Sequence, residues 1–198
     1  TALVRHPDVD MVSLTGSVEA GQEILRNAAE KVMKTSLELG GKAPAIVFPD
    51  ADLDLAVKGV TDSRLIYSGQ VCNCCERVYV HDAIYDEFVA KLKASFEAAA
   101  YGDPFADPVP VYSSQIDAKQ LEKIDQMVAR AVAAGGEVIT GGRRADLGTG
   151  YFYEPTLIAG VTQDSEIVQQ EVFGPVLPVL RWSDYDQVMA DANGVEYG

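Results

Sequence analysis

Two segments of this sequence place a reactive side chain next to glycines, where other backbone groups can approach closely. Glu38 opens the segment Glu38-Leu-Gly-Gly-Lys42, and Cys72 ends the segment Gly69-Gln-Val-Cys72. A carboxylate at such a place can serve as a general base. A thiol at a tight turn near amide donors can form a thiolate nucleophile. Taken singly, each segment is more often structural, as a turn or a helix cap.

A third glycine-flanked segment, Gly16-Ser-Val-Glu-Ala-Gly21, follows an apolar stretch and opens a helical pattern. Its outer glycines have the spacing of a phosphate-binding loop, but Gln22 stands where that loop requires lysine, which argues against nucleotide hydrolysis. The start of a helix still offers backbone N–H groups and a positive dipole end, which suit a pyrophosphate. The plain alternative is a helix start with Ser17 as its N-cap.

The three cysteines, Cys72, Cys74 and Cys75, lie together and cannot close the long loops of a disulfide framework. They indicate a reducing, cytoplasmic compartment. Small buried apolar side chains are the plain alternative, and a redox pair of near-adjacent thiols would strain disulfide geometry. The two histidines, His6 and His81, form no spaced ligand pair. We therefore expect no metal site.

The elements that must position these residues alternate between strand-like and helix-like patterns. Apolar runs predict strands at residues 11–15, 34–39, 44–48, 77–80, 137–140 and 174–180. Helical spacing predicts helices carrying residues 24–32, 53–65, 84–96, 117–134 and 184–192. Strands alternating with helices predict an α/β fold with a largely parallel sheet.

Composition limits the classes of partner. The chain has 198 residues, of which 16 are basic and 30 acidic, and its formal net charge is −14. Such a surface repels phosphate backbones and anionic lipid, which argues against nucleic-acid and membrane partners. No apolar run approaches the roughly 20 residues of a membrane span.

Five motifs follow one another along the chain: Leu14-Thr-Gly-Ser17, Glu38-Leu-Gly-Gly-Lys42, Gly69-Gln-Val-Cys72 with Arg77 five residues on, Glu171-Val-Phe-Gly-Pro175, and Asn193-Gly-Val-Glu-Tyr-Gly198. In this order they resemble the NAD(P)-dependent aldehyde dehydrogenase superfamily over nearly the whole chain. The segment Val71-Cys-Asn-Cys74 is most similar to the lactaldehyde and glycolaldehyde dehydrogenase branch.

The resemblance implies catalytic roles for two residues. Cys72 matches the nucleophile, which attacks the aldehyde carbonyl to give a thiohemiacetal and, after hydride transfer to the nicotinamide, a thioester. The backbone N–H of Cys72 would be one donor to the oxyanion. Glu38 matches the general base that activates water to hydrolyse the thioester.

The same resemblance implies a cofactor site for NAD, with NADP left open. Gly16 and Ser17 match the turn against the pyrophosphate, and Gly40 lies beside the nicotinamide. Glu171 matches the carboxylate that holds the nicotinamide ribose, with Phe173 near the ring. Cys74 and Cys75 have no role in the family pattern.

The resemblance also implies a domain organisation. Residues 1–40 would be the C-terminal part of a Rossmann-like coenzyme-binding domain, and residues 41–198 a catalytic domain truncated at its C-terminal end. We expect a piece of a longer cytoplasmic enzyme that oxidises a small aldehyde and forms a homo-oligomer. The competing interpretation is an inactive catalytic-domain piece that acts only in folding or self-association.

Two positions depart from the family pattern. Tyr67 stands where most members have asparagine, which puts in doubt the hydrogen bonding that shapes the turn before Cys72. The segment Ser113-Ser-Gln-Ile116 replaces the usual Gly-Pro-Leu-Ile, and we expect this change to alter only a loop.

Overall fold

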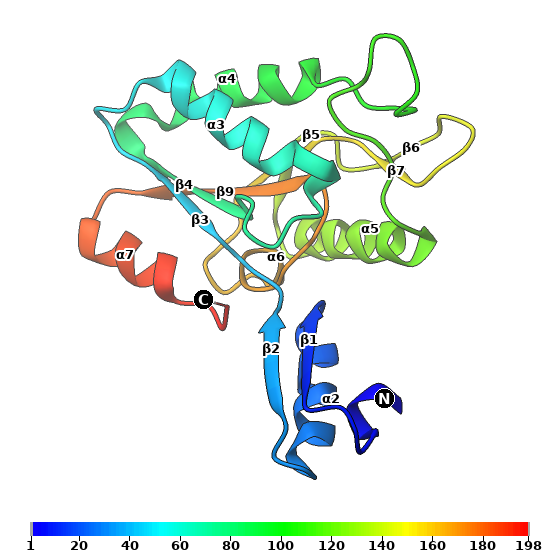
Figure 1. The fold of residues 1–198 in the computed structure, drawn as a ribbon. Helices are drawn as coiled ribbons and strands as arrows, with labels where there is room; N and C mark the ends of the chain where they lie inside the picture. The colour runs from blue at the N-terminus through cyan, green and yellow to red at the C-terminus, as the bar shows by residue number, and fades with distance from the viewer. Residues whose placement is uncertain (1, 198) are drawn as a thin grey trace. The chain divides into compact units, whose positions relative to one another are not determined.

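The computed structural model describes residues 2–197, and within this range the chain divides into two compact units, residues 2–40 and 41–197 (Figure 1). Thr1 and Gly198 lie outside the described residues, so the last position of the Asn193–Gly198 motif does as well. No helix among the described residues is long and apolar enough to span a membrane.

The first unit is a strand-helix-strand arrangement preceded by a short helix. Its elements are α1 (Ala2–Arg5), β1 (Met11–Thr15), α2 (Val18–Ala29) and β2 (Lys34–Glu38). The strands are parallel, with Met11 opposite Lys34 and Thr15 opposite Glu38. The helix ends before the predicted residue 32, because Val32 has a φ of 51° and the Met33 N–H bonds back to the Ala28 carbonyl.

The second unit contains a mixed sheet whose strands, within the described residues, lie in the order β3-β4-β9-β8-β5. All neighbours are parallel except β5 and β8, which are antiparallel. The predicted α/β fold with a mostly parallel sheet is therefore confirmed. The strands are β3 (Pro44–Val47), β4 (Arg77–His81), β5 (Glu137–Thr140), β8 (Thr156–Ala159) and β9 (Val176–Trp182), with β6 (Arg144–Ala145) and β7 (Phe152–Tyr153) forming a separate pair.

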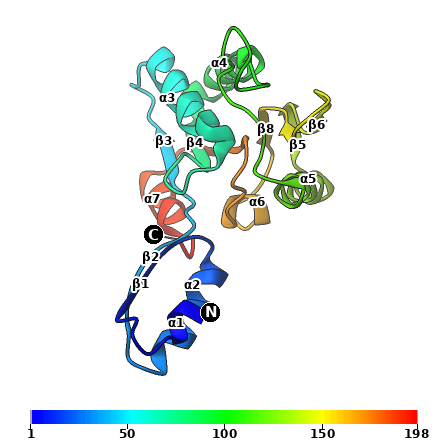
Figure 2. The same cartoon turned by 45° about the vertical axis from the view of Figure 1, so that its right-hand side comes forward.

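Helices cover both faces of this sheet (Figures 1 and 2). Side chains alternate between the two faces along a strand. Val78 and Val80 of β4 therefore pack on the face covered by one group of helices, and Tyr79 packs on the face covered by the other group. Asp52, Asp117 and Asp184 cap three of these helices. The first group is α3 (Leu53–Leu65) and α4 (Tyr85–Ala98), and the second is α5 (Ala118–Ala133), α6 (Glu166–Gln169) and α7 (Tyr185–Asn193).

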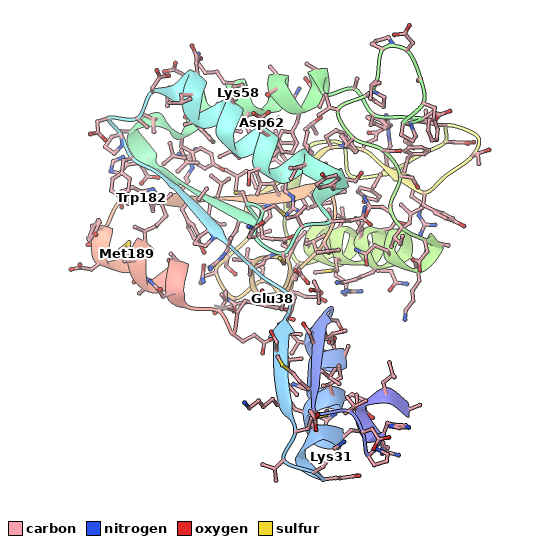
Figure 3. All side chains as sticks on the ribbon, viewed as in Figure 1. Lys31, Glu38, Lys58, Asp62, Trp182 and Met189 are labelled. Atoms are coloured by element: carbon pink, nitrogen blue, oxygen red, sulfur yellow. The ribbon has the colours of Figure 1, made fainter. Side chains whose placement is uncertain are left out.

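Side chains fill both sides of the sheet in Figure 3, where Trp182 marks the end of β9 and Met189 lies on α7. The Trp182 indole N–H donates to the Val47 carbonyl, so this end of the sheet is joined across strands. At the opposite, amino-terminal ends of the strands, β3 follows Lys42, β4 follows the segment that contains Cys72, and β9 follows the segment 171–175.

Candidate active site

Cys72 lies in a sharply folded connection between α3 and β4, residues 66–76, here called the cysteine turn. It begins with the short helix η1 (Ile66–Gly69). Tyr67, Ser68 and Gly69 are all in the left-handed region, with φ values of 46°, 62° and 74°. This conformation ends α3 and reverses the chain before Cys72, whose side chain is half-buried. The predicted tight turn after a helix is present.

The cysteine turn is held by the segment 113–116. Ser68 Oγ donates to the Ser113 carbonyl at 2.7 Å, and Gln115 Nε2 donates to the Ser68 carbonyl at 3.0 Å. The Ile116 N–H donates to Gln70 Oε1 at 2.9 Å. The sequence change at residues 113–116 was expected to alter only a loop. The structure shows instead that this segment is hydrogen-bonded to the turn that carries Cys72. These contacts join residues about 45 positions apart, which the sequence pattern did not indicate.

Tyr67 is in an unfavourable conformation, since a bulky residue with positive φ is strained whereas asparagine tolerates this region. Its side chain is 74% exposed, so little packing is lost on replacement. We expect Tyr67→Asn to raise the free energy of unfolding by about 1 kcal/mol, measured by urea titration. Phe105→Asn is the matched control, because Phe105 is also exposed but has no positive φ. An unchanged or lower stability in Tyr67→Asn would contradict the strain argument.

Glycines bring other segments against the cysteine turn. A Cβ atom on Gly41 would lie 2.0 Å from the Cys72 carbonyl oxygen, and one on Gly69 would lie 2.2 Å from the Gly174 carbonyl oxygen. Neither contact is possible for a residue with a side chain unless the backbone moves. The second glycine of the Glu38–Lys42 motif is therefore needed for close approach to the Cys72 backbone.

Glu171 lies at the same junction. One oxygen of its carboxylate, Oε1, accepts a hydrogen bond from the Gly41 N–H at 2.8 Å. Burial raises the pKa of Glu171 above its ordinary value, although the Gly41 N–H opposes this shift. Phe173, two residues on, has a φ of 56°. The structure thus brings Gly41, the cysteine turn and the Glu171–Phe173 segment together within the second unit.

A buried ion cluster, which sequence reasoning missed, lies behind this junction. Glu76 Oε2 is 2.8 Å from Lys42 Nζ, and Glu76 Oε1 is 2.7 Å from an Arg64 guanidinium nitrogen. All three side chains are fully buried. Burial by itself raises the pKa of Glu76, but the Arg64 and Lys42 charges outweigh it and hold the pKa below its ordinary value. The carboxylate is therefore ionised and offsets part of the positive charge that Arg64 and Lys42 bring inside the unit.

The other two cysteines differ from Cys72 in their surroundings. Cys74 and Cys75 are 3% and 7% exposed. Burial raises the pKa of both thiols, that of Cys75 to about 12. The Cys74 thiol donates to the Val71 carbonyl. Both are packing residues kept as neutral thiols, which leaves Cys72 as the accessible thiol of the turn.

Four of the predicted site residues belong to the first unit. The Gly16 N–H donates to the Glu38 carbonyl at 2.9 Å, at the ends of β1 and β2. Ser17 is the N-cap of α2, and its Oγ accepts from the Ala20 N–H. Glu38 is the last residue of β2 (labelled in Figure 3), and Gly40 follows it. Within this unit the helix start and the predicted base are therefore neighbours.

The histidines have local capping contacts. His6 Nδ1 accepts from the Asp8 N–H, and His81 Nδ1 accepts from the Ala83 N–H at the start of η2 (Asp82–Ile84). Across residues 2–197, no group of three or more His, Cys, Asp or Glu side chains is placed to hold a metal ion.

Comparison with known proteins bears directly on this arrangement. The model of the aldehyde dehydrogenase family matches residues 1–198. Lactaldehyde dehydrogenase of Escherichia coli K12 is 49% identical over 196 residues, which are 99% of this chain and 41% of that protein. Its crystal structure superposes with a TM-score of 0.95 at 48% identity, covering 98% of this chain and 41% of that one.

A second solved structure, that of a 3,6-anhydro-L-galactose dehydrogenase in complex with NADP, has a TM-score of 0.95 and 43% identity. The match covers 98% of this chain and 41% of the chain in that structure. The chain thus spans about two fifths of the length of the relatives it matches. The family model, however, covers the chain completely, and the motif order, the fold and the solved structures agree with it. This chain belongs to the aldehyde dehydrogenase family.

Proposed function

We propose that the protein oxidises a small aldehyde to its carboxylic acid with a nicotinamide cofactor, through a thioester on Cys72. The observation that carries this proposal is the position of Cys72. It is the half-buried thiol of a strained turn, in contact with Gly41 and beside the loop that bears Glu171. Membership of the aldehyde dehydrogenase family supports the reaction class.

Cys72 supplies the nucleophile. Its Sγ, as the thiolate left after loss of the thiol proton to solvent, forms a bond to the aldehyde carbon. The carbonyl π electrons move to oxygen, which takes a proton back from solvent to give a thiohemiacetal. The Cys72 backbone N–H is proposed as one donor to the developing oxyanion. Loss of a hydride from carbon and of the O–H proton then leaves a thioester on Sγ. When bound, the oxidised nicotinamide cofactor supplies the hydride acceptor.

Glu38 is proposed as the general base for the second half of the reaction. Its carboxylate takes a proton from water as the water oxygen attacks the thioester carbon. The C–S bond then breaks, the thiolate leaves, and the carboxylic acid is released. Glu38 is suited to this by its place at the end of β2, two residues before Gly40, where the lack of a side chain lets other groups approach closely.

The residues present fit a nicotinamide cofactor. Gly16 and Ser17 open a helix of 12 residues, whose N-terminal N–H groups and dipole favour a pyrophosphate. Glu171 Oε1 accepts from the Gly41 N–H, and a carboxylate has a second oxygen of the kind that accepts hydrogen bonds from ribose hydroxyls. Phe173 and Gly40 are proposed to lie beside the nicotinamide ring.

The finer assignments follow from the relatives. Lactaldehyde dehydrogenase supports a short hydroxyaldehyde, lactaldehyde or glycolaldehyde, as the substrate. The NADP complex of another relative makes NADP an alternative to NAD. The free cysteines support a reducing cytoplasm. Exposed apolar side chains such as Phe105 and Val109 support self-association into a homo-oligomer.

An activity assay tests the proposal. The protein, expressed at its full natural length, is mixed with NAD or NADP and with lactaldehyde or glycolaldehyde, and absorbance of the reduced nicotinamide is followed. We expect one carboxylic acid per reduced cofactor, and faster turnover with one cofactor than with the other. Acetaldehyde serves as the comparison that lacks the hydroxyl group. Absence of cofactor reduction with every aldehyde would contradict the proposed function.

A further inference from the structure

The loop that bears Glu171 and Phe173 is held on both sides by side chains from elsewhere in the second unit. We propose that Glu76 and Gln120 are positioning residues that clamp the backbone N–H and C=O groups of Val172 and Phe173 and so hold this loop in its cofactor-binding conformation. This inference rests on the proposed function, since it assigns the clamp to the cofactor side of that reaction.

Glu76 binds the N–H side of the loop. Its Oε2 accepts from the Val172 N–H and its Oε1 from the Phe173 N–H, each at 3.2 Å. Two consecutive backbone donors thus point at one carboxylate, as at the start of a helix. The carboxylate is fully buried, so no water competes for these bonds. Hydrogen bonds to an ionised acceptor are stronger than neutral ones.

Gln120 binds the carbonyl side of the same loop. From the first turn of α5, its Nε2 donates to the Val172 carbonyl at 3.0 Å and to the Phe173 carbonyl at 2.8 Å. Val172 and Phe173 are therefore each fixed through the backbone N–H by one side chain and through the backbone C=O by the other. A local turn would not need two distant residues to satisfy its backbone.

The loop requires such support because of its conformation. Phe173 has a φ of 56°, in the region where residues with a side chain are strained, and such residues persist only where their surroundings hold them. Phe173 is also the residue proposed to lie near the nicotinamide. Glu171 precedes the clamped pair directly, so a shift of Val172 would move its carboxylate from the Gly41 N–H.

Through its two ion pairs, Glu76 also connects this loop to the cysteine turn. Its partner Arg64 donates to the Gly69 carbonyl at 2.6 Å and to the Cys75 carbonyl at 3.0 Å. Its other partner, Lys42, follows Gly41, which lies against the Cys72 backbone. A carboxylate suits this place because it accepts from all four donors, two at each oxygen. A glutamine would offer one acceptor atom and would leave two buried cations unbalanced.

The test compares Gln120→Leu and Glu76→Asp with the wild type, at full natural length. Gln120→Leu removes one side of the clamp without removing a buried charge, and Glu76→Asp keeps the charge but shortens its reach. Gln126→Leu is the matched control, because Gln126 lies on the same helix, is exposed, and donates from Nε2 to the exposed Glu122. The readouts are KM for NAD, KM for the aldehyde, kcat, and hydrogen exchange of the Val172 and Phe173 amides.

We expect Gln120→Leu to raise the KM for NAD by about three- to tenfold and Glu76→Asp by about tenfold or more, since each loses hydrogen bonds to the loop. In Gln120→Leu, which leaves the Glu76, Arg64 and Lys42 cluster intact, the KM for the aldehyde should stay within about twofold. The two amides should exchange faster in both variants. Gln126→Leu should change none of these values. A general loss of stability would not raise the KM for NAD while leaving the KM for the aldehyde unchanged.

Several results would overturn the inference. These are an unchanged KM for NAD in both clamp variants, an equal rise in the KM values for NAD and for the aldehyde in Gln120→Leu, unchanged exchange of the two amides, or loss of the fold in Gln120→Leu. If the wild type reduces neither NAD nor NADP, the proposed function fails instead. Amide exchange still decides in that case whether the clamp exists, because it needs no turnover.

Discussion

Replacing Cys72 by alanine is expected to abolish aldehyde oxidation, with kcat lowered by a factor on the order of 10⁴ or more. The substitution removes the atom that we propose forms the covalent intermediate, and we expect that the neighbouring thiols do not replace it. Cys74 and Cys75 are buried, and burial holds the pKa of each thiol above its ordinary value. The loss should appear in kcat with the KM for NAD nearly unchanged, as measured by steady-state absorbance assays.

The matched control for this substitution is Cys74→Ala, two residues further along the same turn. It removes a thiol that bonds to the Val71 carbonyl but that we assign to packing. We expect its activity to stay within about tenfold of the wild type, since a cavity the size of one sulfur atom costs about 1 kcal/mol. Iodoacetamide followed by peptide mass spectrometry should label Cys72 before either neighbour. A Cys74→Ala protein as inactive as Cys72→Ala would contradict the assignment of the nucleophile.

Much of the fold could be predicted because its signals are local. The helices α3, α5 and α7 begin after Asp52, Asp117 and Asp184, whose carboxylates accept from backbone N–H groups within the next three residues. Such caps are visible in the sequence. Strand β8 was not predicted, because its four residues are buried on both faces and show no alternation. Short apolar runs of this kind do not identify a strand by periodicity.

The candidate site also contains residues that the sequence indicated and residues that it did not. The motif order located Cys72 and Glu171, and the structure places the loop of Glu171 beside the cysteine turn through Gly41 and Gly174. Glu76 gave no such signal, since most charged residues are solvated and its partner Lys42 lies 34 residues away. Burial and pairing of charges are properties of the folded chain. Residues that position a site are therefore harder to predict than residues that match a motif.

Glu38→Gln is expected to lower kcat by a factor of about 10² to 10⁴, the usual contribution of a general base. Glutamine has nearly the same shape but cannot take a proton from water, so thioester hydrolysis becomes the slow step. In the proposed mechanism, formation of the thioester needs the Cys72 nucleophile and the cofactor rather than Glu38. Rapid mixing should therefore show a burst of reduced cofactor of about one equivalent per active thiol, followed by slow turnover.

The intermediate itself can be detected in this variant. Mass spectrometry of Glu38→Gln quenched after the burst should find the acyl group on the peptide that contains Cys72. Hydroxylamine, which attacks thioesters without a general base, should restore cofactor reduction and release a hydroxamate. Glu30→Gln is the matched control, because Glu30 is an exposed glutamate of the same unit at the end of α2, and it should behave as the wild type. A Glu38→Gln protein with neither burst nor acyl adduct would place Glu38 before the thioester, as the base that deprotonates the thiol.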